Sequence, residues 1–126
     1  MKKILIIDDD TVFSKTLSDY LPQEKYTVVT ATNGKEGLEK INSEKPDLVL
    51  LDMSMPEMNG IEMLKEINKE GLRVPILIAS QVSQMEVISK GIEEGFEAGV
   101  KGYILKSSET PEMIVKTIEK TLATSE

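Results

Sequence analysis

The sequence places polar side chains that could do chemistry directly after short apolar runs. They are the carboxylates of Asp8, Asp9, Asp10 and Asp52, the hydroxyl of Ser80 and the ammonium group of Lys106. Carboxylates on short loops suit Mg²⁺, which prefers oxygen ligands and keeps several waters that a phosphate can replace. A lysine beside them could pair with the acids and with a bound phosphate. The residue types therefore indicate metal-assisted phosphate chemistry.

This chemistry requires that the acids lie close together in the fold. In open α/β sheets, ligands bind beyond the carboxyl ends of the strands, where the strand order reverses. If the first and third strands flank that point, Asp8, Asp9 and Asp52 share one crevice. Two carboxylates about 4 Å apart repel by on the order of 4 kcal/mol at an effective dielectric near ~20, so three stay ionised together only around a cation. The local alternatives are a helix cap for Asp10 and a solvated acidic corner for Asp8 and Asp9.

Five apolar runs supply the strands that would position these groups. The runs are 4-ILII-7, 26-YTVVTA-31, 48-LVLL-51, 76-ILIA-79 and 103-YIL-105. None alternates cleanly between apolar and polar residues, which is typical of strands covered on both faces of a parallel sheet. Segments with helical apolar spacing follow each strand, around Val12–Leu21, Leu38–Ile41, Ile61–Ile67, Met85–Phe96 and Ile114–Leu122. This alternation predicts a doubly wound parallel sheet, α/β in class, with helices on both faces, in one domain spanning residues 1–126.

The composition limits the classes of function. Fifteen basic and 22 acidic residues give a net charge of −7, which argues against direct binding to nucleic acid or to an anionic membrane. The chain has no Cys and no His, so thiol catalysis, imidazole bases and most zinc sites are excluded. The apolar run in MKKILII ends at Asp8, which is too early for a signal peptide or a membrane span. A cytoplasmic protein is expected.

Four motifs together resemble a known family. They are 4-ILIIDDD-10, 46-PDLVLLDMSMPEMNG-60, 75-PILIAS-80 and 102-GYILK-106. In order and approximate spacing they are similar to the receiver domain of two-component response regulators, over essentially the whole chain. The resemblance implies a flavodoxin-like fold with strand order 2-1-3-4-5 and five helices. It also implies a signalling receiver that is itself phosphorylated and dephosphorylated, and not an enzyme that turns over a diffusible substrate.

The resemblance assigns a role to each acid and to the lysine. Asp52 would be the phosphoacceptor and Lys106 would contact the phosphoryl group. Mg²⁺ would be held directly by Asp52 and Asp9, through water by Asp8, and by the backbone carbonyl of Ser54. These assignments make Mg²⁺ the expected cofactor.

The resemblance also implies a switch and several partners. The hydroxyl of Ser80 would bond the phosphoryl group, and Tyr103 would be the aromatic switch that follows Ser80. The other interpretation of Tyr103 is a strand aromatic packed on the last helix. The phosphoryl donor would be a sensor histidine kinase or a histidine phosphotransfer protein. The output would be a downstream protein partner or a fused effector domain, with possible homodimer formation through the face made by the fourth helix, the fifth strand and the fifth helix.

Three features depart from the usual receiver pattern. Ser107 follows Lys106 where the family usually has a cis proline. A non-proline cis bond costs about 2.5–4 kcal/mol, so either this bond is trans or the fold supports the strain. Gln81 follows Ser80 where the family favours Ala or Gly, and its long side chain is expected to slow phosphoryl turnover. The segment from Ser80 to Lys106 is also roughly one helical turn longer than usual, within residues 85–102.

Three other functions are compatible with parts of the pattern. A small Mg²⁺-dependent phosphohydrolase would use Asp52 as nucleophile but needs a second acid/base group and a substrate pocket. A flavodoxin-like flavin carrier needs a hydroxyl- or glycine-rich phosphate loop after the first strand, where this chain has three acids. A pseudo-receiver would keep the fold as a binding module without phosphorylation, and Ser107 and Gln81 leave this alternative open.

Overall fold

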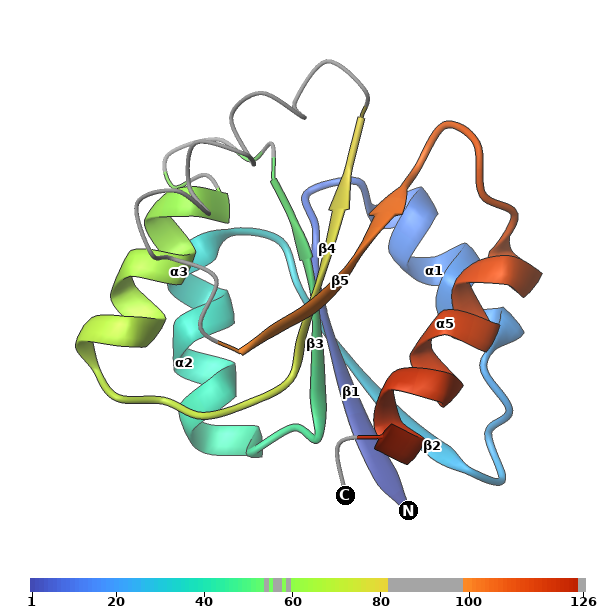
Figure 1. The fold of residues 1–126 in the computed structure, drawn as a ribbon, viewed down its shortest axis with the longest axis horizontal. Coiled ribbons are helices and arrows are strands. Elements are labelled where there is room, and N and C mark those ends of the chain that lie inside the picture. Colours follow the sequence, from blue (N-terminus) through green and yellow to red (C-terminus); the bar gives the residue numbers. More distant parts are fainter. Residues whose placement is uncertain (54, 56–57, 59, 82–98, 125–126) are drawn as a thin grey trace.

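A parallel sheet forms the centre of the fold, with helices on both faces (Figure 1). The computed structural model describes residues 1–53, 55, 58, 60–81 and 99–124. The strands in this part of the chain are β1 (Lys2–Ile7), β2 (Tyr26–Ala31), β3 (Leu48–Asp52), β4 (Ile76–Ser80) and β5 (Val100–Leu105). They pair in the order β2-β1-β3-β4-β5, and each pairing is parallel. The predicted fold class and strand order are confirmed.

Helices cover both faces of this sheet. Helices α2 (Gly34–Glu44) and α3 (Gly60–Lys69) lie on one face, and α1 (Thr11–Tyr20) and α5 (Pro111–Thr124) lie on the other (Figure 1). These are four of the five predicted helices, and the remaining prediction, residues 85–96, lies outside the described residues. None of the helices in the described part of the chain is long and apolar enough to cross a membrane.

The sheet separates two apolar cores. Residues Leu5, Ile7, Val49 and Leu51 belong to the core under α2 and α3, and their chain neighbours Ile4, Ile6, Leu48 and Leu50 belong to the core under α1 and α5. Successive strand residues point to opposite faces, so strands buried on both sides need unbroken apolar runs. All residues of β3 and β4 are buried. The carboxyl ends of these strands are therefore firmly held.

The loop after β1 is fixed by the first turn of α1. Asp10 is the N-cap residue, and its Oδ1 accepts hydrogen bonds from the backbone N–H groups of Val12 (3.1 Å) and Phe13 (3.0 Å). These N–H groups have no partner within the helix, so a carboxylate at this position stabilises its start. The local interpretation of Asp10 as a helix cap agrees with the structure.

Replacing Asp10 by Ala should therefore lower the free energy of unfolding by about 1 kcal/mol, the usual loss for an N-cap. Urea unfolding followed by circular dichroism measures this change. Asp10→Asn is the matched control, because it keeps a capping oxygen and removes a negative charge near Asp8 and Asp9. It should be at least as stable as the unchanged protein. Equal stability of the Ala and Asn variants would contradict a capping role.

Candidate functional site

Three carboxylates meet at the carboxyl ends of β1 and β3. Ile7 on β1 lies in register with Leu51 on β3, so the next residues, Asp8 and Asp52, lie side by side. The chain leaves β1 for β2 on one side and reaches β3 on the other, so strand order reverses at this point. One carboxylate oxygen from each of Asp8, Asp9 and Asp52 lies within 4.8 Å of the others. The strand ends thus bring together the acids that the sequence singled out.

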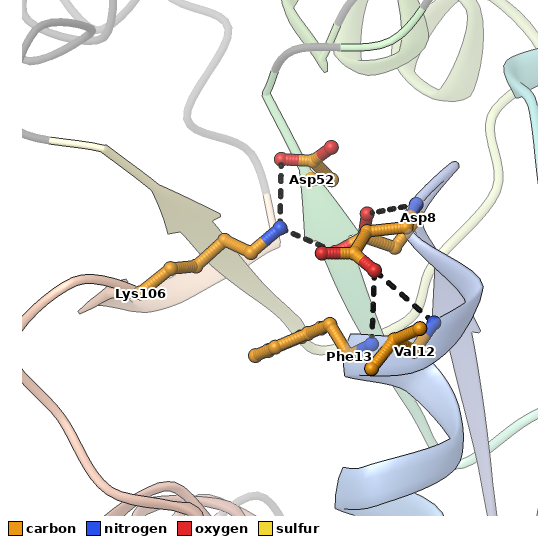
Figure 2. Close-up of polar contacts among 6 residues, drawn as sticks. Asp8, Val12, Phe13, Asp52 and Lys106 are labelled. Carbon is orange, nitrogen blue, oxygen red and sulfur yellow. Dashed lines mark hydrogen bonds and ion pairs between the residues drawn. The ribbon is translucent and has the colours of Figure 1, made fainter.

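Two of these acids are buried and one is exposed. Asp8 is 2% exposed and Asp52 is 4% exposed, whereas Asp9 faces solvent. Both carboxylate oxygens of Asp8 accept hydrogen bonds: Oδ1 accepts from the Asp10 N–H at 2.9 Å and Oδ2 accepts from the Lys106 ammonium at 2.8 Å. Asp52 Oδ1 lies 3.8 Å from the same ammonium (Figure 2). Lys106 therefore bridges the two buried carboxylates.

Lys106 is brought to the acids by the backbone at the end of β5. Its N–H donates to the Ser80 carbonyl at 2.9 Å, and its side chain is only 10% exposed. Burial by itself lowers the pKa of Lys106. The hydrogen bond to Asp8 and the attraction of Asp8, Asp52 and Asp10 outweigh this effect and raise the pKa. The ammonium group is consequently charged at neutral pH.

The donor set fits a hard divalent cation. Lys106 carries one positive charge against three carboxylates, so the cluster keeps a net negative charge. All donors are oxygens, and Asp9 lies on the solvent side, where water could complete an octahedral shell such as that of Mg²⁺. Ser54, whose carbonyl was expected to be a further ligand, lies outside the described residues.

Ser80 ends β4 with a buried hydroxyl group. The residue is 0% exposed, and its Oγ has no hydrogen-bond partner among the described residues. A buried unpaired hydroxyl typically costs about 1–3 kcal/mol, so Ser80 has a hydrogen-bonding capacity that the described protein groups do not use. Its neighbour Gln81 is exposed. Tyr103 lies on β5 in register with Ile78, and it is 38% exposed.

Two residues around Lys106 were missed by the sequence analysis. Phe13 lies in the first turn of α1, directly after the acidic loop, and its ring centroid is 4.4 Å from the Lys106 Nζ. Glu109 closes the turn after β5, because its carboxylate accepts the Leu105 N–H at 2.8 Å while its own N–H donates to the Leu105 carbonyl at 3.1 Å. The four-residue spacing of Glu109 from Leu105 was the only feature of the sequence that could have predicted this turn.

No peptide bond between described residues is cis, so Lys106–Ser107 is trans.

The strand order and the acidic site beyond β1 and β3 define a doubly wound α/β protein of the flavodoxin-like class. Residues 4–119 match the model of the response regulator receiver domain. The chain therefore belongs to the response regulator receiver domain family.

Several known proteins are similar to this chain. The chemotaxis protein CheY of Thermotoga maritima is 37% identical over 120 residues, which cover 94% of this chain and 96% of that protein. The probable C4-dicarboxylate response regulator DctR of Bacillus subtilis is 39% identical over 106 residues, covering 82% of this chain but 45% of that protein.

Solved receiver structures share the fold. A CheY-like receiver domain protein from Methanospirillum hungatei JF-1 has a TM-score of 0.82 at 30% identity, covering 98% of this chain and 95% of that one. The receiver domain of the Francisella response regulator 1452 has a TM-score of 0.84 at 23% identity, covering 100% of both chains, and it supports the fold alone.

Proposed function

We propose that this receiver domain accepts a phosphoryl group on Asp52 from the phosphohistidine of a sensor kinase or a histidine phosphotransfer protein. The observation that carries the proposal is the meeting of Asp8, Asp9 and Asp52 with Lys106 within reach of both buried acids. A lone carboxylate at the end of a strand would need no such arrangement. The family consists of signalling receivers, and turnover of a diffusible substrate is not part of this proposal.

In the proposed reaction, a carboxylate oxygen of Asp52 attacks the phosphorus of the donor. An O–P bond forms, the P–N bond breaks, and its electron pair stays on the imidazole nitrogen. Lys106 stabilises the oxygens of the transferring group by charge-assisted hydrogen bonds. Asp52 and Asp9 would hold Mg²⁺ directly, Asp8 through water, and Ser54 through its carbonyl. When bound, Mg²⁺ neutralises charge on the phosphoryl oxygens and thereby assists transfer.

The signal would pass from the new phosphoryl group to the surface around β5. The Ser80 hydroxyl is proposed to donate to a phosphoryl oxygen, which would give this buried group the partner that the described residues do not provide. Tyr103, partly exposed on the adjacent strand, is proposed to follow Ser80. A coupling of about 1–3 kcal/mol between site and surface is typical of allosteric proteins. The proposed output is binding of a downstream partner, a fused effector domain or a second copy at the face that includes β5 and α5.

Incubation with acetyl phosphate and Mg²⁺ tests this proposal without a cognate kinase. Intact-protein mass spectrometry should show a single added phosphoryl group, and EDTA should abolish the addition because the acids need a cation to accept another anion. Calcium should substitute poorly, since it prefers longer and more numerous ligand bonds. Absence of the adduct at every Mg²⁺ concentration would favour a pseudo-receiver. Steady hydrolysis of a generic phosphate ester would favour the phosphohydrolase.

A further inference from the structure

The ammonium group of Lys106 lies over the face of an aromatic ring. Its Nζ is 4.4 Å from the centroid of Phe13, which is within the range of a cation–π interaction (Figure 2). We propose that Phe13 is a positioning residue that holds Lys106 in place for phosphoryl transfer. This inference rests on the proposed function, because it concerns the lysine that would contact the phosphoryl group.

Lys106 needs such a contact because its side chain is long and flexible. A lysine ammonium is a point charge on a four-carbon stem and loses considerable rotamer entropy when it is fixed. The 2.8 Å hydrogen bond to Asp8 is one anchor. Asp8 would also hold Mg²⁺ through water in the proposed function, so this anchor would be shared between the ammonium and the metal site. The Phe13 ring has no metal-ligating atom and can keep the ammonium near Asp52.

A neutral aromatic ring suits this position better than a charged anchor. A further carboxylate would neutralise the ammonium and repel an incoming phosphoryl group, whereas the face of a ring attracts a cation without net charge. Phe13 is itself fixed at two points. Its N–H donates to the Asp10 carboxylate at 3.0 Å, and its side chain packs against the core between the sheet and helices α1 and α5. The ring is therefore a preorganised support.

Phe13→Leu separates the attraction of the ring from its packing. Leucine keeps an apolar side chain against the core but has no π face. At saturating Mg²⁺, loading from acetyl phosphate should slow by about three- to tenfold, the effect expected for a cation–π contact on a partly desolvated lysine. Phe13→Tyr keeps a ring and should load at nearly the unchanged rate. Tyr20→Leu removes an exposed aromatic ring at the far end of α1 and is the matched control.

A double-mutant cycle tests whether Phe13 acts through Lys106. Phe13→Leu should have little further effect on the loading rate when Lys106 is already Ala, because the two residues are then uncoupled. The same fold-loss in both backgrounds would show a merely structural role and overturn the inference. Equal loading rates of the unchanged protein and Phe13→Leu would also overturn it, while leaving the proposed function intact. Failure of the unchanged protein to load would overturn both.

A second measurement is independent of phosphorylation. In the NMR spectrum of the protein without donor, the ε-methylene protons of Lys106 should be shifted upfield by the ring current of Phe13. The shift should persist in Phe13→Tyr and disappear in Phe13→Leu; its absence in the unchanged protein would overturn the inference.

If Phe13→Leu fails to fold, ring-fluorinated phenylalanines at position 13 keep the side-chain volume while weakening the attraction between the ring and the Lys106 ammonium. The loading rate should then fall as fluorines are added, and a constant rate would overturn the inference.

Discussion

Replacing Lys106 by Met should lower the free energy of unfolding by about 3 kcal/mol in metal-free buffer, because it leaves a buried carboxylate without its counter-charge. Asp8 is 2% exposed and gives up a 2.8 Å charge-assisted hydrogen bond, and Asp52 loses the nearby ammonium. The loading rate should also fall by about 100-fold or more, as for other donors to a transition-state oxygen. Urea unfolding in EDTA and loading from acetyl phosphate measure the two effects.

The partly exposed ion pair of Lys3 with Glu44 provides the matched control. Lys3 Nζ lies 3.0 Å from Glu44, with the two side chains 31% and 38% exposed. Lys3→Met should therefore cost less than about 1 kcal/mol, as exposed pairs usually do, and should leave loading unchanged. Added Mg²⁺ should restore much of the stability lost in Lys106→Met, because a cation can take the place of the ammonium. Similar losses in the two variants would contradict the buried bridge.

The strand pattern could be predicted from the sequence because the central strands are buried on both faces. Runs such as 48-LVLL-51 and 76-ILIA-79 carry a strong apolar signal, and they correspond to β3 and β4. Strand β5 lies at the edge of the sheet and is only partly buried, and in its first half Val100 is followed by Lys101 and Gly102, so this half has no apolar run. The predicted run 103–105 therefore covers only its second half.

The start of α2 was harder to place because its first turn is nearly free of apolar residues. The helix begins at Gly34, before the first apolar position of the pattern, Leu38. Its start is set by hydrogen bonds. The Asn33 side chain accepts the Glu36 N–H at 2.9 Å, and the Glu36 carboxylate accepts the Thr32 N–H at 3.0 Å. Such local capping determines a boundary that apolar spacing alone cannot.

The acids of the candidate site could be predicted because residues that follow adjacent parallel strands lie at the same edge of the sheet. Asp8 and Asp52 follow adjacent parallel strands, and the topology alone brings them together. The surroundings of Lys106 carry no comparable signal. The Phe13 ring meets Lys106 because the lysine side chain extends from the end of β5 to Asp8, close to the start of α1, and nothing in the local sequence records that contact. Whether Lys106–Ser107 is cis or trans was also left open by the sequence, and the structure has it trans.

Asp52→Asn should abolish the covalent phosphoryl adduct and at the same time stabilise the metal-free protein by on the order of 1 kcal/mol. The amide is no nucleophile, so loss of the adduct follows from the chemistry. The stabilisation follows from the charges, because Asp52 is 4% exposed and lies with Asp8 and Asp9 within 4.8 Å, against the single ammonium of Lys106. Repulsion between the acids should slightly outweigh the attraction to the lysine.

The two readouts of Asp52→Asn separate chemistry from stability. Asp19→Asn is the matched control, since Asp19 is an exposed partner of Lys15 on α1. It should load normally and change the unfolding free energy by less than about 0.5 kcal/mol. An adduct that survives in Asp52→Asn would place the acceptor elsewhere, and a loss of stability would show that the Lys106 attraction dominates. A gain of stability with a loss of loading would instead show that these acids are kept together at the expense of stability, as expected for groups retained to bind a cation and accept a phosphoryl group.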